Sequence, residues 1–128
     1  MKRIVSLLTV FILIVSACNR ADEIELQNYT NIEGNYIGTF ERNGNISNVE
    51  LQLENNEFSG NSDIDKFPAI CNGNFNISTD TIVFENTCGW YANFDWTLIL
   101  NGNWHYTFDN NVLTMEKSNG DKYILTKQ

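Results

Sequence analysis

Hydrophobic and polar residues alternate with a period of two through most of this chain. From residue 34 onward, apolar side chains occupy every second position of several short runs. This alternation is typical of β-strands that bury one face against a core. After residue 31 no segment carries apolar residues at helical spacing. The pattern predicts an all-β domain with these inward positions: Tyr36, Phe40, Val49, Leu51, Leu53, Phe75, Ile77, Ile82, Phe84, Phe94, Trp96, Leu98, Leu100, Trp104, Tyr106, Phe108, Leu113, Met115, Tyr123 and Leu125.

Short polar segments between these runs predict hairpin turns. A two-residue turn pairs residues whose numbers have an odd sum, and the paired side chains lie on the same face of the sheet. This rule places Leu53 opposite Phe58, and Phe75 opposite Phe84. Asn accepts the positive φ angles that type I′ turns require. The expected two-residue turns are Asn43-Gly44, Asn55-Asn56, Thr79-Asp80 and Asn110-Asn111.

Two further turns fit the pattern only as three-residue loops. A loop over residues 118–120 pairs Met115 with Tyr123 and puts Gly120 in the left-handed position of a bulged turn. A loop over residues 101–103 makes the run 94–100 a strand of its own. That second loop predicts three pairs, which are Leu100 with Trp104, Leu98 with Tyr106, and Trp96 with Phe108.

About eight or nine consecutive antiparallel strands result from these turns. Closure of such a meander removes its exposed edges, so we expect an up-and-down β-barrel rather than a two-sheet sandwich. The hairpin register that pairs Phe75 with Phe84 also sets Cys71 opposite Cys88. We therefore predict a disulfide between these two cysteines, which an oxidising compartment would preserve.

The N-terminus has the order of a secretory signal. Lys2 and Arg3 precede an apolar run over residues 4–15, and Val15-Ser16-Ala17-Cys18 follows. The run is about twelve residues long, too short for a spanning helix of about 20. The final cysteine resembles the lipobox of bacterial lipoproteins. This resemblance implies cleavage before Cys18, a lipid on Cys18, and anchoring in the cell envelope; a secreted protein without lipid is the alternative.

The signal divides the chain into three parts. Residues 1–17 are the expected signal peptide, residues 18–31 a lipidated cysteine with an acidic tether, and residues 32–128 the barrel domain. The 111 residues left after cleavage suffice for one domain. They carry 6 basic and 16 acidic residues, a net charge of about −10. This balance argues against a nucleic-acid partner and leaves a basic protein as a candidate partner.

Part of the barrel sequence resembles lipocalins. Gly34-Asn35-Tyr36 is similar to their G-x-W signature on the first strand, with Tyr in place of Trp. The segments 100–106, 113–115 and 123–125 resemble the end of small lipocalin-like lipoproteins of Gram-negative bacteria. The likeness covers residues 32–127 and implies a lipocalin-like barrel at the outer membrane. Ala21-Asp22-Glu23 resembles the sorting tags of surface-exposed lipoproteins.

No catalytic constellation stands out, so we expect neither an enzyme nor a cofactor. The only histidine, His105, falls on an outward position. Asn61-Ser62-Asp63-Ile64-Asp65 spaces oxygen ligands as calcium loops do, but it lacks the glycine and distal glutamate of an EF-hand, so we expect no metal site.

The aromatic residues carry the remaining functional signal. Inward aromatic side chains would fill a small barrel as its core, or line a cavity for a small hydrophobic ligand at one mouth. Trp90 and Tyr91, in an irregular stretch beside Cys88, are candidate rim contacts. The candidate interior ligand-binding residues are Tyr36, Phe75, Phe84, Phe94, Trp96, Trp104, Tyr106 and Phe108.

These features favour a membrane-anchored, non-enzymatic protein that binds a small hydrophobic ligand or a surface component. One alternative is an inhibitor of a basic hydrolase such as a lysozyme or a protease. Residues 118–123 faintly resemble the serine-glycine-tyrosine loop of lysozyme inhibitors, and the negative charge suits a cationic partner. Another alternative is a structural surface lipoprotein without a small ligand.

Overall fold

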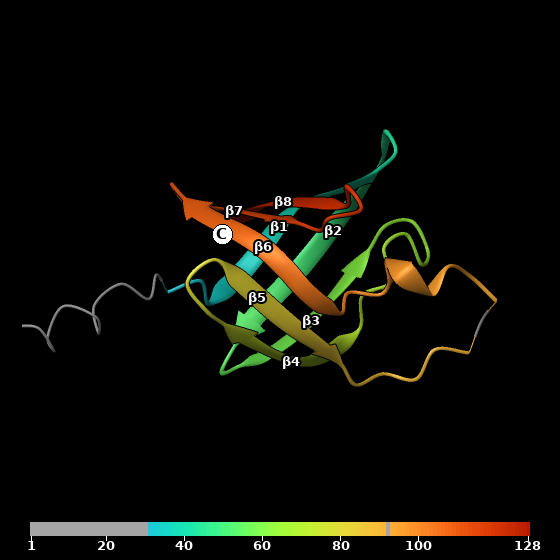
Figure 1. Ribbon diagram of the computed structural model, residues 1–128, viewed down its shortest axis with the longest axis horizontal. Helices are drawn as coiled ribbons and strands as arrows, with labels where there is room; N and C mark the ends of the chain where they lie inside the picture. Colours follow the sequence, from blue (N-terminus) through green and yellow to red (C-terminus); the bar gives the residue numbers. More distant parts are fainter. Residues whose placement is uncertain (1–30, 92) are drawn as a thin grey trace, which may run out of the picture.

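The computed structural model describes residues 31–91 and 93–128. The signal segment, Cys18 and nearly all of the expected tether lie outside these residues. Eight antiparallel strands form the fold, each pairs with the next, and the last pairs with the first (Figure 1). The strands are β1 (Gly34–Arg42), β2 (Asn45–Glu54), β3 (Glu57–Ser62), β4 (Asn72–Ile77), β5 (Thr81–Asn86), β6 (Gly102–Asp109), β7 (Val112–Glu116) and β8 (Lys122–Lys127). The prediction of a closed up-and-down barrel is confirmed, and the barrel is consistent with a lipocalin-like fold.

The turn chemistry sets the register of the hairpins as expected. Leu53 pairs with Phe58, and Phe75 pairs with Phe84. Met115 pairs with Tyr123 across the three-residue loop, where Gly120 has a φ of 96°. The asparagines of the two-residue turns adopt the left-handed conformation that such turns demand, with φ angles of 50–64° at Asn43, Asn55, Asn56, Asn110 and Asn111.

The expected ninth strand, over residues 94–100, does not exist. Its middle forms a 3₁₀ turn, η1 (Trp96–Leu98), and β6 pairs directly with β5, with Trp104 opposite Ile82. The hairpin over residues 101–103 and its three predicted pairs are therefore wrong. The Asp95 carboxylate caps η1 by accepting the Thr97 N–H, which bends the chain away from an extended path.

The barrel interior is filled by side chains. Tyr36, Phe75, Phe84 and Trp104 are each 3% exposed or less, and the buried aliphatic residues of the same cluster are each 8% exposed or less. A solvent-sized void beside these side chains would appear as exposed area on them, so they pack as a dense core. Within this core the Tyr123 hydroxyl is buried without a hydrogen-bond partner among the described residues.

The two ends of the barrel are built differently. The turn end, defined by the three turns at residues 55–56, 79–80 and 110–111, is covered by Ile32 from the segment before β1. The loop end carries the long connections over residues 63–71 and 87–101, which extend to the right in Figure 1. Ala69 and Ile99 form a parallel bridge between these two loops, so the loops close this mouth together. Among the described residues, no helix has the length and apolarity needed to cross a membrane.

Candidate functional site

Three aromatic side chains gather on the outside of the loop end, and we name them the rim cluster: Trp90, Phe94 and Trp96. Trp90 meets Phe94 edge-on with ring centroids 5.7 Å apart, and Phe94 stacks on Trp96 at 6.0 Å with an interplanar angle of 28°. Trp96 remains 57% exposed. Trp90 and Phe94 are half-buried beside it, so the cluster presents one exposed indole and marks a candidate contact site.

The rim cluster borders a groove of about 440 Å³ beside the disulfide. This volume lies within the range of about 300–1,000 Å³ that is typical of small-molecule sites. The lining residues carry no formal charge and combine two indoles with two amides. They are Asn86, Cys88, Gly89, Trp90, Trp96, Ile99 and Asn101.

The disulfide ties the groove to the barrel wall. Cys71 precedes β4, Cys88 follows β5, and their Cα atoms are 6.2 Å apart in a bonded pair. The disulfide predicted from hairpin register is confirmed. It fixes the point where the chain leaves β5, two residue pairs beyond Gly73 and Asn86 in the ladder.

Two amides hold the floor of the groove. The Asn86 N–H donates to Asn101 Oδ1 over 2.9 Å, which sets the orientation of the Asn101 amide. Asn86 Nδ2 donates to the Cys88 carbonyl, and Asn86 Oδ1 accepts from the Trp90 indole at 3.4 Å. These bonds link the rim cluster to the ends of β5 and β6.

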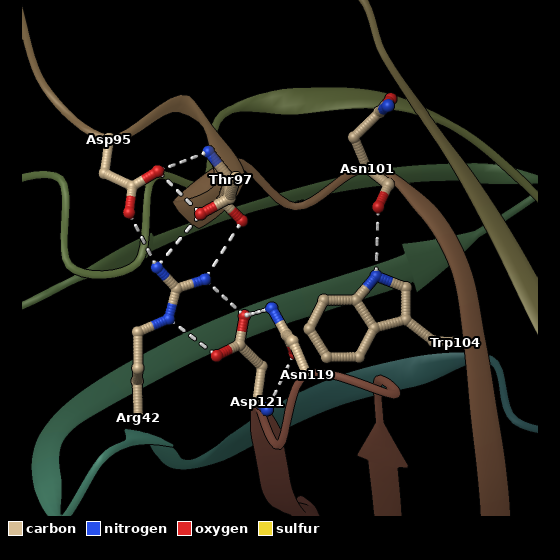
Figure 2. Close-up of polar contacts among 7 residues, drawn as sticks. All are labelled: Arg42, Asp95, Thr97, Asn101, Trp104, Asn119 and Asp121. Atoms are coloured by element: carbon tan, nitrogen blue, oxygen red, sulfur yellow. Dashed lines mark hydrogen bonds and ion pairs between the residues drawn. The ribbon is translucent and has the colours of Figure 1, made fainter.

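Arg42, the last residue of β1, clamps η1 against the barrel (Figure 2). Its Nη1 donates to Asp95 Oδ2 and to Thr97 Oγ1, both at 3.0 Å, and its Nη2 donates to the Thr97 carbonyl at 3.3 Å. Asp95 Oδ1 accepts the Thr97 N–H and hydroxyl at 2.9 and 2.6 Å. Trp96 lies between the two clamped residues, so this network holds it at the rim.

Asp121 orients Arg42 from the opposite side of the guanidinium. Nε and Nη2 of Arg42 donate to its two carboxylate oxygens at 2.6 and 2.5 Å, a bidentate arrangement with geometric specificity. The Asp121 side chain is only 2% exposed. Its hydrogen bond raises the pKa of Arg42, and hydrogen bonds from Thr97 followed by the charge of Arg42 lower the pKa of Asp95. Arg42 and Asp95 are therefore both charged at neutral pH.

Two lysines lie over aromatic rings near the same mouth. Lys66 Nζ is 5.9 Å from the centre of the Phe94 ring, and Lys117 Nζ is 4.8 Å from that of Trp104. Such contacts contribute about 0.5–1 kcal/mol at exposed sites. Burial lowers the pKa of Lys117. The Lys66 contact joins the loop 63–71 to the rim cluster and so helps to fix Phe94.

The structure separates the predicted interior residues into two groups. Tyr36, Phe75, Phe84 and Trp104 point inward and are buried, while Tyr106 and Phe108 are half-buried against the core. Phe94 and Trp96 were expected to point inward from a strand, and this is wrong, since both belong to the rim cluster on the loop 87–101. The filled interior favours the core role of the inward group over a ligand cavity.

Trp90 and Tyr91, the predicted rim residues, differ in how far they are exposed. Trp90 is half-buried within the rim cluster, whereas Tyr91 is 97% exposed. His105 faces outward. The Ser47 hydroxyl donates a hydrogen bond to the Asp63 carboxylate over 2.7 Å, and this bond lowers the pKa of Asp63. Among the described residues, no three His, Cys, Asp or Glu side chains gather as metal ligands.

The polar residues that build the site leave little signal in the sequence. Arg42 and Asp121 are 79 positions apart in the chain, and no local signal connects them. The spacing of Asp95 and Thr97 is a local signal, because an aspartate two residues before a threonine can cap a helical turn.

Comparison with protein-family models, curated proteins and solved structures finds no match to this chain.

Proposed function

We propose that this protein is a non-enzymatic, lipid-anchored binding protein of lipocalin-like fold that holds its ligand in the groove beside the rim cluster. The observation that carries the proposal is an aromatic cluster outside a filled barrel, with Trp96 57% exposed. Trp and Tyr dominate the energetics of binding surfaces, because their large rigid rings bury much area with little loss of entropy.

The clamp supports a binding role for this surface. Arg42 spans from β1 to η1 and to the loop before β8, and it fixes the two residues on either side of Trp96. A side chain held in place before the ligand arrives loses less conformational entropy on binding. The disulfide adds a second fixed point at Cys88, on the far side of the groove. The site is thus preorganised on a rigid scaffold.

A ligand screen by saturation-transfer NMR tests this proposal. The screen compares the unmodified protein with the double variant Trp90→Ala/Trp96→Ala against a set of small aromatic, aliphatic and sugar fragments. We expect fragment signals with the unmodified protein and at least a tenfold loss of affinity in the variant. An Ile46→Ala variant, altered at a side chain that is 59% exposed on β2, is the control and should bind as the unmodified protein does. Binding that is indifferent to the double variant contradicts the proposal.

Lipid anchoring through Cys18 is the second part of the proposal. The apolar run that ends in Val15-Ser16-Ala17-Cys18 supports it. Mass measurement of the protein from the cell envelope should give a chain that starts at Cys18 and carries added acyl mass. The Cys18→Ala variant should lose that mass and leave the membrane fraction. An unmodified N-terminus at another residue would overturn this part.

Inhibition of a basic hydrolase remains as a second candidate function, favoured by one observation. The outer wall of β2 to β5 carries Glu50, Glu54, Glu57 and Glu85, and these four strands contain no Lys or Arg. Such a surface attracts cationic proteins at low ionic strength. Salt-dependent binding of lysozyme, lost in Glu54→Gln/Glu57→Gln but retained in Trp96→Ala, would favour this function over the rim site.

A further inference from the structure

We infer that the groove beside the rim cluster takes a neutral saccharide, with one sugar ring packed on Trp96. This inference rests on the proposed function and gives it a ligand class. A pyranose ring has C–H groups across its faces and hydroxyl groups around its edge. It therefore needs an exposed aromatic plane and nearby uncharged donors and acceptors, and the groove supplies both.

The aromatic planes have the right disposition for such a ring. Phe94 stacks on Trp96 at an interplanar angle of 28°, so the Trp96 indole is held by a second aromatic ring. Trp90 is inclined at 65° to Phe94 and lines the groove together with Trp96. The electron-rich face of an indole attracts the polarised C–H groups of a sugar, and the contact also removes apolar surface from water.

The amides of the groove suit hydroxyl groups. Asn101 uses its Oδ1 to accept the Asn86 N–H, and its Nδ2 has no hydrogen-bond partner among the described residues. Asn101 therefore offers a donor whose orientation is already fixed. A hydroxyl group accepts such a bond and can donate in turn. A neutral amide also avoids the desolvation penalty of a charged group.

Charge and shape exclude the main competing ligands. No lining residue carries a charge, so an anionic sugar gains no ion pair from the lining, and the net charge of −8 opposes its approach at long range. The nearby cations already have partners, because Lys66 lies over the Phe94 ring and Arg42 bonds Asp95 and Asp121. The carboxylate next to Trp96, that of Asp95, already accepts bonds from Arg42 and Thr97. An acyl chain gains about 0.8 kcal/mol for each CH₂ that is buried. The open rim buries few such groups, and the enclosed space of the barrel is filled.

Calorimetric titration of the whole processed chain in a sugar-free detergent tests the inference. The probes are neutral tetrasaccharides of glucose, mannose and N-acetylglucosamine, a uronic-acid tetrasaccharide, and dodecanoate. We expect at least one neutral tetrasaccharide to bind, and the other two probes to bind at least tenfold more weakly. Trp96→Ala should weaken the neutral sugar at least tenfold, and the control Ile46→Ala should leave it unchanged.

A near-isosteric variant sharpens the test. Asn101→Asp keeps the oxygen that accepts the Asn86 N–H and removes the donor, so the fold should persist while sugar affinity falls about three- to tenfold. Should Trp96→Ala fail to fold, the shift of the Trp96 indole signal in the unmodified protein replaces it as the readout. Binding of dodecanoate or the uronic acid at the rim, without any neutral sugar, overturns the saccharide and leaves the proposed function standing. Absence of any ligand that responds at Trp96 overturns both.

Discussion

The turn end and the loop end of this barrel are closed by different kinds of interaction. At the turn end, turns with only two central residues reverse the chain at Asn55-Asn56, Thr79-Asp80 and Asn110-Asn111. At the loop end, two long connections cross the mouth and are held by a disulfide, an arginine clamp and aromatic contacts. Local backbone preference suffices for the first, whereas the second depends on contacts between distant residues. The candidate site lies at the end where side chains, rather than turns, fix the chain.

The largest expected effect concerns the core that both ends share. Leu53 is fully buried at the turn end, and Leu53→Ala should lower the free energy of unfolding by about 2–5 kcal/mol. Urea unfolding should show both ends lost in one transition. As a control, Ile37→Ala changes a side chain that is 50% exposed on the outer wall, and it should shift stability by about 0.5 kcal/mol or less. A loss below 1 kcal/mol for Leu53→Ala would mean that the interior is not densely packed.

The disulfide should contribute somewhat less to the free energy of unfolding than the upper value expected for the Leu53 side chain. Cys71 and Cys88 close a loop with a sequence separation of 17, for which the chain-entropy relation gives about 3 kcal/mol. The double variant Cys71→Ala/Cys88→Ala should lose this amount in urea unfolding. Adding a reductant to the unmodified protein should produce the same loss. Equal stability with and without the bond would contradict a role for it in holding the loop end.

A change in the opposite direction is expected at Tyr123. Its hydroxyl is fully buried without a hydrogen-bond partner in the part of the chain that the structure describes, and burial raises its pKa well above the usual value. Tyr123→Phe removes the unsatisfied hydroxyl and keeps the ring that packs on Phe40 and Trp104, so stability should rise by about 1 kcal/mol. Thermal unfolding measures the change. A loss of stability would reveal a hydrogen bond to a buried water at this position.

The smallest expected effect is a pH dependence of hydrogen exchange that differs between the two ends of the barrel. Hydrogen bonds from Thr97 and the charge of Arg42 lower the pKa of Asp95, so the ionised form stabilises the folded loop. That contribution is complete above the unfolded pKa of about 3.9, and it is lost as the pH falls through the lower folded value. Hydrogen exchange at the Thr97 and Leu98 amides should quicken in this range relative to turn-end amides. Asp95→Asn should abolish the pH-dependent difference, and a uniform response at both ends would refute the clamp.

The sequence predicted the turn end well because its rules are local. Asparagine at positive φ and the parity of paired positions determine the register of Leu53 and Leu113, and parity alone gives that of Phe75 across Thr79-Asp80. The same parity also placed Cys71 opposite Cys88, since a ladder propagates its register to its end. These predictions required only a turn and an alternating pattern.

The same rules did not predict the loop end, because an alternating pattern of apolar and polar residues does not by itself make a segment form a strand. Phe94, Trp96 and Leu98 alternate with polar residues, yet β5 already occupies the edge of β6 with which this run was expected to pair. The run is instead buried at the mouth, where Leu98 packs against the core and Phe94 packs against Trp96. The residue that organises these contacts, Arg42, acts through partners 53 and 79 positions away. Contacts between residues so far apart in the chain produce no periodic pattern in the sequence.

Ligand binding on the rim of the loop end, and not inside the barrel, can be tested directly with the tryptophan indoles. The chain has three tryptophans, with Trp90 and Trp96 on the groove and Trp104 in the core, so the ¹⁵N signals of their indoles report on both places. Titration with a neutral tetrasaccharide should move the Trp96 and Trp90 signals first and most, and should leave the methyl signals of Leu53 and Leu113 in place. Large shifts of those core methyl groups with an unmoved Trp96 indole would contradict the account.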